Sequence, residues 1–255
     1  MGLYFSVWIQ DRKGTREFQT IYKNFEHRNF GEHILNLDYT AYNDNVICCG
    51  AHWQGKSFFI ANTFLKNLPS IANIWVWDYH GVMTKYTNPP SHLIKRDVKE
   101  LEYGTQFFIP TDRSDKGFEN FLKKALTHRD LVICNDEAHN NSSAHRLKGY
   151  HAELIRNAGN QNISYISIFQ RPQRVNGDVL ENARHRFCFA LDNLNSVKYM
   201  REWIGLECEL FLAPAQRSPQ AKKLFGDADM LPQYSYIYRD KQKLEPEIVE
   251  GGLKL

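Results

Sequence analysis

Eight consecutive residues could bind the phosphates of a nucleotide. They are Gly50-Ala51-His52-Trp53-Gln54-Gly55-Lys56-Ser57, a complete GxxxxGK[ST] or Walker A pattern. In such a loop the glycines let the backbone curl around the β-phosphate, and the following helix adds the positive end of its dipole. The lysine would reach the β- and γ-phosphates, and the serine hydroxyl would bind Mg²⁺. The pattern predicts binding of ATP and Mg²⁺, with nucleotide contacts from Gly50, Gln54, Gly55, Lys56, Ser57 and Phe58.

A carboxylate pair further along the chain could complete this chemistry. Asp136 and Glu137 follow the apolar run Leu131-Val132-Ile133-Cys134 and Asn135, as in a Walker B strand. A buried strand would place Asp136 beside Ser57 as a second Mg²⁺ ligand. Glu137 would then be the general base that activates the attacking water. Carboxylates also follow strands simply to cap the next helix, so the assignment depends on its pairing with the phosphate-binding loop.

The elements that position these residues alternate between strand and helix patterns. The apolar run 45–49 precedes the glycine loop, and 57–68 has helical periodicity, as a phosphate-binding loop requires. This alternation predicts an α/β fold, a RecA-like P-loop NTPase with a central, mostly parallel sheet flanked by helices. The further strands are expected at 74–77, 106–109, 131–134, 163–169 and 186–191, and the further helices at 117–126, 145–158 and 179–183.

Length and composition favour one domain. The 255 residues suit a single ATPase domain, 1–255, with an N-terminal segment 1–43 that wraps the core as a hairpin or short helix. The core is expected at 44–225, and a C-terminal strand and tail at 226–255. Although Asp136-Glu137-Ala138-His139 spells the DEAH box of a helicase superfamily, such helicases need a second RecA-like domain, for which the chain has no room.

Composition and the remaining motifs argue against a membrane, secreted, disulfide-linked or zinc-binding protein. With 42% hydrophobic and 24% charged residues the composition is that of a globular protein, and no apolar run is long enough for a transmembrane segment. The N-terminus lacks a secretory signal, which predicts a cytoplasmic protein. Five cysteines favour free thiols, and the ten histidines match no zinc spacing. The net charge of +3 neither supports nor excludes a nucleic-acid partner.

Several motifs together resemble the HerA/FtsK-type ATPases over about residues 44 to 240. They are GAHWQGKS at Gly50, WVWDYHG around Asp78, LVICNDEAH at 131–139, and the block from Phe169-Gln170-Arg171-Pro172 through Leu180-Glu181-Asn182 to Arg186-Phe187-Cys188-Phe189. The resemblance implies that Gln170 senses the γ-phosphate. It also implies that Arg186 is an arginine finger supplied to the neighbouring subunit of a ring. Arg171, Arg174 and Arg184 are alternatives for that role.

The resemblance implies a particular kind of motor. The nearly bare ATPase core is similar to the genome-packaging ATPases of membrane-containing icosahedral viruses, which pump double-stranded DNA into a preformed capsid. The partners implied are double-stranded DNA, further copies in a ring, expected to be a hexamer, and capsid or membrane vertex proteins. The expected location is the host cytoplasm, with association to the virion packaging vertex. Candidate DNA contacts are the basic residues Lys85, Lys95, Arg96, Arg146 and Lys148.

Two alternatives remain open at this stage. One is a conjugation- or phage-extrusion-type DNA motor, which would share the ATPase core but move single strands or pass a membrane partner. The other is a nucleotide-dependent switch or scaffold that hydrolyses ATP slowly. Glu137 argues against the second, because a protein that only binds nucleotide has no need of a base.

Overall fold

A nine-stranded sheet forms the centre of the computed structural model, which describes residues 4–10, 16–22, 44–65, 73–142, 144–242 and 245–249. The strand order is β11-β10-β9-β3-β8-β7-β4-β6-β5, and all neighbours from β9 to β5 are parallel. β10 is antiparallel to both its neighbours. The strands are β3 (Asn45–Cys49), β4 (Asn73–Trp77), β5 (Ile94–Lys95), β6 (Thr105–Phe108), β7 (Leu131–Asn135), β8 (Ile163–Phe169), β9 (Ala183–Phe189), β10 (Tyr236–Asp240) and β11 (Glu247–Val249).

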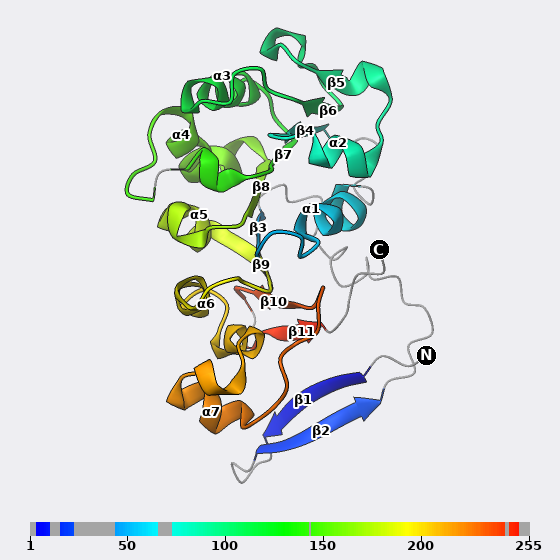
Figure 1. The fold of residues 1–255 in the computed structure, drawn as a ribbon. Helices are drawn as coiled ribbons and strands as arrows, with labels where there is room; N and C mark the ends of the chain where they lie inside the picture. Colours follow the sequence, from blue (N-terminus) through cyan, green and yellow to red (C-terminus); the bar gives the residue numbers. More distant parts are fainter. Residues whose placement is uncertain are drawn as a thin grey trace.

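Helices cover both faces of this sheet (Figure 1). α1 (Lys56–Phe59) and α2 (Val82–Thr87) lie on one face, and α3 (Asp115–Ala125), α4 (Gly149–Asn157), α5 (Gly177–Asn182) and α6 (Leu194–Arg201) lie on the other. α7 (Pro219–Phe225) follows in the C-terminal part. Short 3-10 turns span Ser91–Leu93, Val98–Glu100, Ala138–Asn140, Ala158–Gln161, Pro172–Arg174, Leu206–Phe211 and Pro214–Gln216.

Two hydrophobic clusters, one on each face of the sheet, hold these layers together. Along β4, Trp75 and Trp77 enter the cluster under α3 to α6, whereas Ile74 and Val76 enter the cluster under α1 and α2. Successive side chains of a strand point to opposite faces, so a strand that is apolar throughout must be covered on both sides. The continuous apolar runs of the sequence therefore have their physical reason in this two-sided burial, and the expected fold class is confirmed.

Several element boundaries differ from the expected ones. The helix expected over 145–158 begins only at Gly149, whose φ of 56° is left-handed. There Glu119 of α3 accepts hydrogen bonds from the backbone N–H groups of Tyr150 (2.6 Å) and His151 (3.2 Å). This contact between two helices satisfies donors at the start of α4, and such a long-range cap leaves no local sequence signal.

One further element differs in its bounds from the sequence-based prediction, and another lies within its expected range. The helix expected over 57–68 starts at Lys56 and continues beyond α1 as a π-helix, Ile60–Leu65, while residues 66–68 lie outside the described part of the chain. The C-terminal strand expected within 226–255 is β10, Tyr236–Asp240. β10 pairs with β9 and therefore belongs to the central sheet.

The N-terminal segment is described only in part. β1 (Tyr4–Gln10) and β2 (Arg16–Tyr22) pair in antiparallel fashion as a separate two-stranded sheet. The expected wrapping of the core by 1–43 depends on residues outside the described ranges. No helix in the described ranges is long and apolar enough to cross a bilayer.

A buried histidine in this core predicts a pH-dependent stability. His151 of α4 lies between the rings of Phe118 and Tyr165, and burial lowers its pKa to about 4. The unfolded chain binds a proton near pH 6.5, so this contribution to stability is complete above pH 6.5 and is lost as pH falls towards 4. Between pH 7 and pH 5 the wild type is expected to lose about 2 kcal/mol more unfolding free energy than His151→Phe.

Urea unfolding of both proteins at the two pH values measures this difference. Replacement of the exposed His92 by Phe is the matched control, and it should show the wild-type pH dependence. Equal pH dependence in the wild type and His151→Phe would contradict the prediction.

Candidate functional site

The glycine loop between β3 and α1 is held by close backbone contacts. A Cβ at Gly50 would lie 2.6 Å from Cβ of Phe189, so only glycine fits between β3 and β9. The N–H of Ala51 donates to the carbonyl of Ala190 (2.7 Å), which ties the loop to the end of β9. Gly55 has a left-handed φ of 85° at the start of α1. These contacts give the loop a defined shape.

The lysine of the loop is buried inside it. Lys56 Nζ donates to the carbonyl of Ala51 (2.7 Å), which bridges the loop from its end to its start. Burial lowers the pKa of Lys56, while the nearby Asp136 and Glu137 raise it. A buried ammonium group with a single backbone partner retains donors for phosphate oxygens.

Ser57, in the first turn of α1, meets Asp136, which directly follows β7. Ser57 Oγ donates to Asp136 Oδ1 over 3.1 Å, although the two residues are 79 positions apart. Burial, together with the nearby carboxylates of Glu137 and Asp78, raises the pKa of Asp136 to about 7. Crowded carboxylates and a hydroxyl are hard oxygen ligands, so a divalent cation such as Mg²⁺ fits here both in ligand type and in charge.

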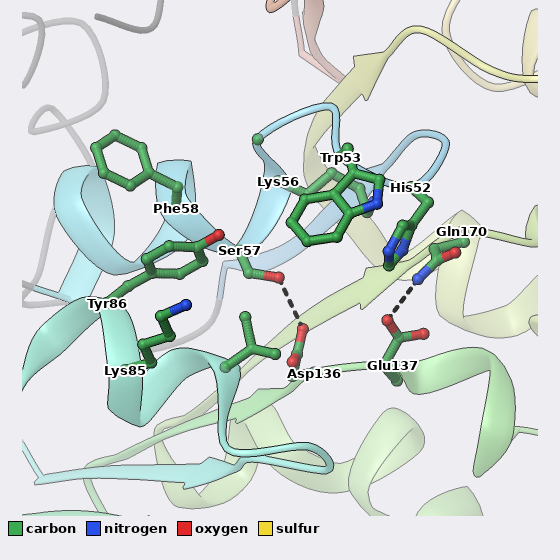
Figure 2. A pocket seen from close by; sticks show the side chains of 12 residues that line it. His52, Trp53, Lys56, Ser57, Phe58, Lys85, Tyr86, Asp136, Glu137 and Gln170 are labelled. Atoms are coloured by element: carbon green, nitrogen blue, oxygen red, sulfur yellow. Dashed lines mark hydrogen bonds between the residues drawn. The ribbon is translucent and has the colours of Figure 1, made fainter. Parts of the chain in front are cut away.

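Glu137 is held between two side chains at the C-terminal end of β7. Gln170 Nε2 donates to Glu137 Oε1 over 2.6 Å (Figure 2), and His139 Nδ1 lies 3.2 Å from the other carboxylate oxygen. Glu137 has a left-handed φ of 65°, which is uncommon for a residue other than glycine. Strained residues of this kind concentrate at functional sites.

These side chains line one pocket. The lining residues are His52, Trp53, Gly55, Lys56, Ser57, Phe58, Val82, Lys85, Tyr86, Asp136, Glu137 and Gln170. Parallel strands end at the same edge of a sheet, so β3, β7 and β8 deliver the loop, the carboxylates and Gln170 to one place. Gly50 and Gln54 belong to the loop but do not line the pocket.

The pocket wall contributed by α2 has no counterpart among the expected elements. Asp78, fully buried at the end of β4, accepts hydrogen bonds from the N–H groups of Met83 (3.1 Å) and Thr84 (2.7 Å) and so orients this helix. Tyr86 then meets Phe58 edge to face, with ring centroids 5.6 Å apart. Lys85, a candidate DNA contact by sequence, lies in the pocket wall instead. Asp78 followed by Gly81 was a signal for a short capped helix.

The arginines differ in their surroundings. Arg186, only 6% exposed, donates to the carbonyls of Ala183, Trp203 and Glu181. This placement does not fit an arginine finger, because the guanidinium is already used by its own chain. Arg184 is also occupied, since it pairs with Asp44 (2.8 Å) and Asp240 (3.4 Å).

Arg171 and Arg174 are the remaining candidates for the finger. Both are exposed. Arg171 directly follows Gln170 of the pocket lining, and Arg174 is the last residue of the turn Pro172–Arg174. Both also lower the pKa of His139. Their position leaves both guanidinium groups accessible to another molecule.

Comparison with known proteins gives similarity in structure alone. No protein-family model matches the chain, and no curated protein matches it by sequence. The genome packaging NTPase B204 from Sulfolobus turreted icosahedral virus 2, in complex with AMPPCP, is similar with a TM-score of 0.65 and 16% identity over 84% of this chain and 100% of that chain.

Two further solved structures are similar. One is B204, the DNA-packaging ATPase from Sulfolobus Turreted Icosahedral Virus, with a TM-score of 0.62 and 18% identity over 82% of this chain and 97% of that chain. The other is the pCW3 conjugation coupling protein TcpA with ATPgS, with a TM-score of 0.50 and 13% identity over 82% of this chain and 60% of that chain. The chain therefore has the fold of these P-loop ATPases, as the sequence motifs implied.

Proposed function

We propose that this chain is an Mg²⁺-dependent ATPase that drives double-stranded DNA into a viral capsid. The observation that carries the proposal is the pocket in which Lys56, Ser57, Asp136, Glu137 and Gln170 converge from three neighbouring strands. The likeness to B204 supports genome packaging as the setting, because its complete length is covered by this chain. As part of this proposal, the protein acts in the host cytoplasm at the packaging vertex of the virion.

Each side chain has a role that follows from its position. The N–H groups of the glycine loop and Lys56 bind the phosphates, while Ser57 and Asp136 would hold Mg²⁺. That ion would neutralise charge on the transferred phosphoryl group. Glu137 accepts the proton of the attacking water. Gln170, which donates a hydrogen bond to Glu137, would also contact the γ-phosphate and so link the presence of ATP to the position of Glu137.

The second half of the proposal is a ring of identical subunits, a hexamer by analogy with related motors. Arg171 or Arg174 of one subunit would reach the pocket of its neighbour, since both are exposed beside the pocket. An arginine placed there stabilises charge in the transition state. Hydrolysis would thereby depend on assembly, and each event would be coupled to movement between subunits.

Contacts to DNA are proposed for basic side chains outside the pocket. Arg96, Arg146 and Lys148 are exposed, and Lys95 is half-buried on β5. A ring needs few cations per subunit, because its channel collects them from every copy. Such contacts to phosphates are independent of base sequence and weaken as the salt concentration rises.

Steady-state ATP hydrolysis with and without linear double-stranded DNA tests the proposal. We expect DNA to raise the turnover severalfold at low salt, with the stimulation falling as salt is added. Stimulation by single-stranded DNA only would favour the conjugation-type motor, to which the likeness with TcpA points. Turnover indifferent to DNA, in protein shown to be assembled, would contradict a DNA motor and favour a switch or scaffold.

A further inference from the structure

The carboxylate of Glu137 makes two side-chain contacts, of which the proposed function uses one. Gln170 binds Oε1, and His139 Nδ1 lies 3.2 Å from Oε2. A general base works only if its oxygen is directed at the proton that it accepts. Two contacts on the two oxygens limit the rotation of the carboxylate, whereas one contact would leave it free to turn about that partner.

His139 is placed for this contact by the backbone. Glu137 precedes the 3-10 turn Ala138–Asn140, and its left-handed conformation brings residue 139 back beside the Glu137 side chain. The His139 side chain is only 9% exposed. Its Nδ1 is buried and, although it lies 3.2 Å from Glu137 Oε2, it makes no hydrogen bond with any of the residues that the structure describes. An unpaired buried donor costs about 1–3 kcal/mol, so a small rotation towards Glu137 is favoured.

The charges around His139 decide how it can act. Burial lowers its pKa, Glu137 raises it, and Arg171, Arg174 and Lys56 lower it. The net effect is a lowered pKa, so the ring is neutral at neutral pH. A neutral ring that donates from Nδ1 orients the carboxylate and leaves its negative charge in place.

We propose that His139 is a positioning residue that donates a hydrogen bond from Nδ1 to Glu137 and, together with Gln170, holds the carboxylate in the orientation needed for hydrolysis. This inference rests on the proposed role of Glu137 as the base. His139 itself does not line the pocket. Its contribution acts through Glu137 alone.

The contact can be tested without any hydrolysis. In nucleotide-free protein labelled with ¹⁵N-histidine, two-bond ¹H–¹⁵N correlation spectra show which ring nitrogen carries a proton, and the His139→Asn variant assigns the signal. We expect a proton on Nδ1 of His139 at neutral pH. A proton on Nε2 alone would overturn the proposal. Because this measurement needs no turnover, it separates a failure of the proposal from a failure of the ATPase function.

Two substitutions then test the consequence for catalysis. His139→Ala removes the donor and is expected to lower kcat about tenfold while KM for ATP stays unchanged, since the phosphate contacts remain. His139→Asn keeps an N–H group near the position of Nδ1 and should retain most of the activity. The exposed His92→Ala is the control and should equal the wild type.

Three kinetic outcomes would overturn the proposal. Wild-type kcat in His139→Ala would show that the contact has no catalytic effect. A raised KM with unchanged kcat would show that His139 acts on nucleotide binding instead of on the base. An equal loss in the Asn and Ala variants would show that the ring is needed for packing and not as a donor.

Discussion

Replacing Glu137 by Gln is expected to lower the turnover of ATP by a factor of about 10² to 10⁴. An amide keeps the shape of the carboxylate but cannot accept the proton of the attacking water. Glu137 lines the pocket beside Asp136, where its carboxylate can accept that proton. The loss should appear in kcat, because Glu137 has no role in holding the phosphates.

Nucleotide binding separates this loss from a collapse of the site. Glu137→Gln should bind a fluorescent ATP analogue with about wild-type affinity, whereas Lys56→Ala, which removes the buried ammonium of the loop, should bind it weakly. The exposed Glu153→Gln on α4 makes the same chemical change elsewhere and should hydrolyse ATP normally. Wild-type turnover in Glu137→Gln would exclude Glu137 as the general base.

The second large effect concerns the arginine that acts between subunits. Removing the finger from an assembled ring is expected to lower turnover about 10³-fold or more. We expect this loss from Arg171→Ala or Arg174→Ala, since both side chains are exposed beside the pocket. The exposed Arg156→Ala on α4 is the matched control and should retain activity.

Mixing of variants shows whether the arginine acts in trans. A Glu137→Gln subunit has an inactive pocket but supplies its arginine, and a finger variant has an intact pocket but lacks the arginine. A mixed ring should therefore recover part of the activity that neither variant has alone. Failure of mixing, in rings shown to contain both variants, would contradict action between subunits.

Arg186 should behave differently from Arg171 and Arg174. Because its guanidinium donates to three backbone carbonyls of its own chain, Arg186→Ala removes a donor from the buried hydrogen bond with Ala183 and from the part-buried one with Trp203. Loss of activity in that variant should accompany a loss of thermal stability, and mixing with Glu137→Gln should not restore it. If Arg186→Ala were stable and its ATPase activity were restored by mixing with Glu137→Gln, Arg186 would be the arginine finger.

The sequence by itself determined the features that depend on short spacings. The glycine loop, the apolar strand before it and the carboxylates after residues 131–135 are local patterns whose chemistry requires fixed neighbours. Parallel strands end at one edge, so the meeting of Ser57 and Asp136 followed from the alternation of elements, whereas the role of Gln170 was implied by the family resemblance. The strands were predictable for the same reason, since burial on both faces demands continuous apolar runs.

Only the tertiary structure decided which polar side chains are used inside the chain and which remain available. Arg186 and Arg171 look alike in the sequence, yet one binds its own backbone and the other is exposed. The start of α4 depends on Glu119 of another helix, and the contact of His139 with Glu137 depends on a left-handed backbone turn. These contacts depend on burial and on hydrogen bonds between segments that are distant in the sequence. Such hydrogen bonds leave no periodic pattern in the sequence.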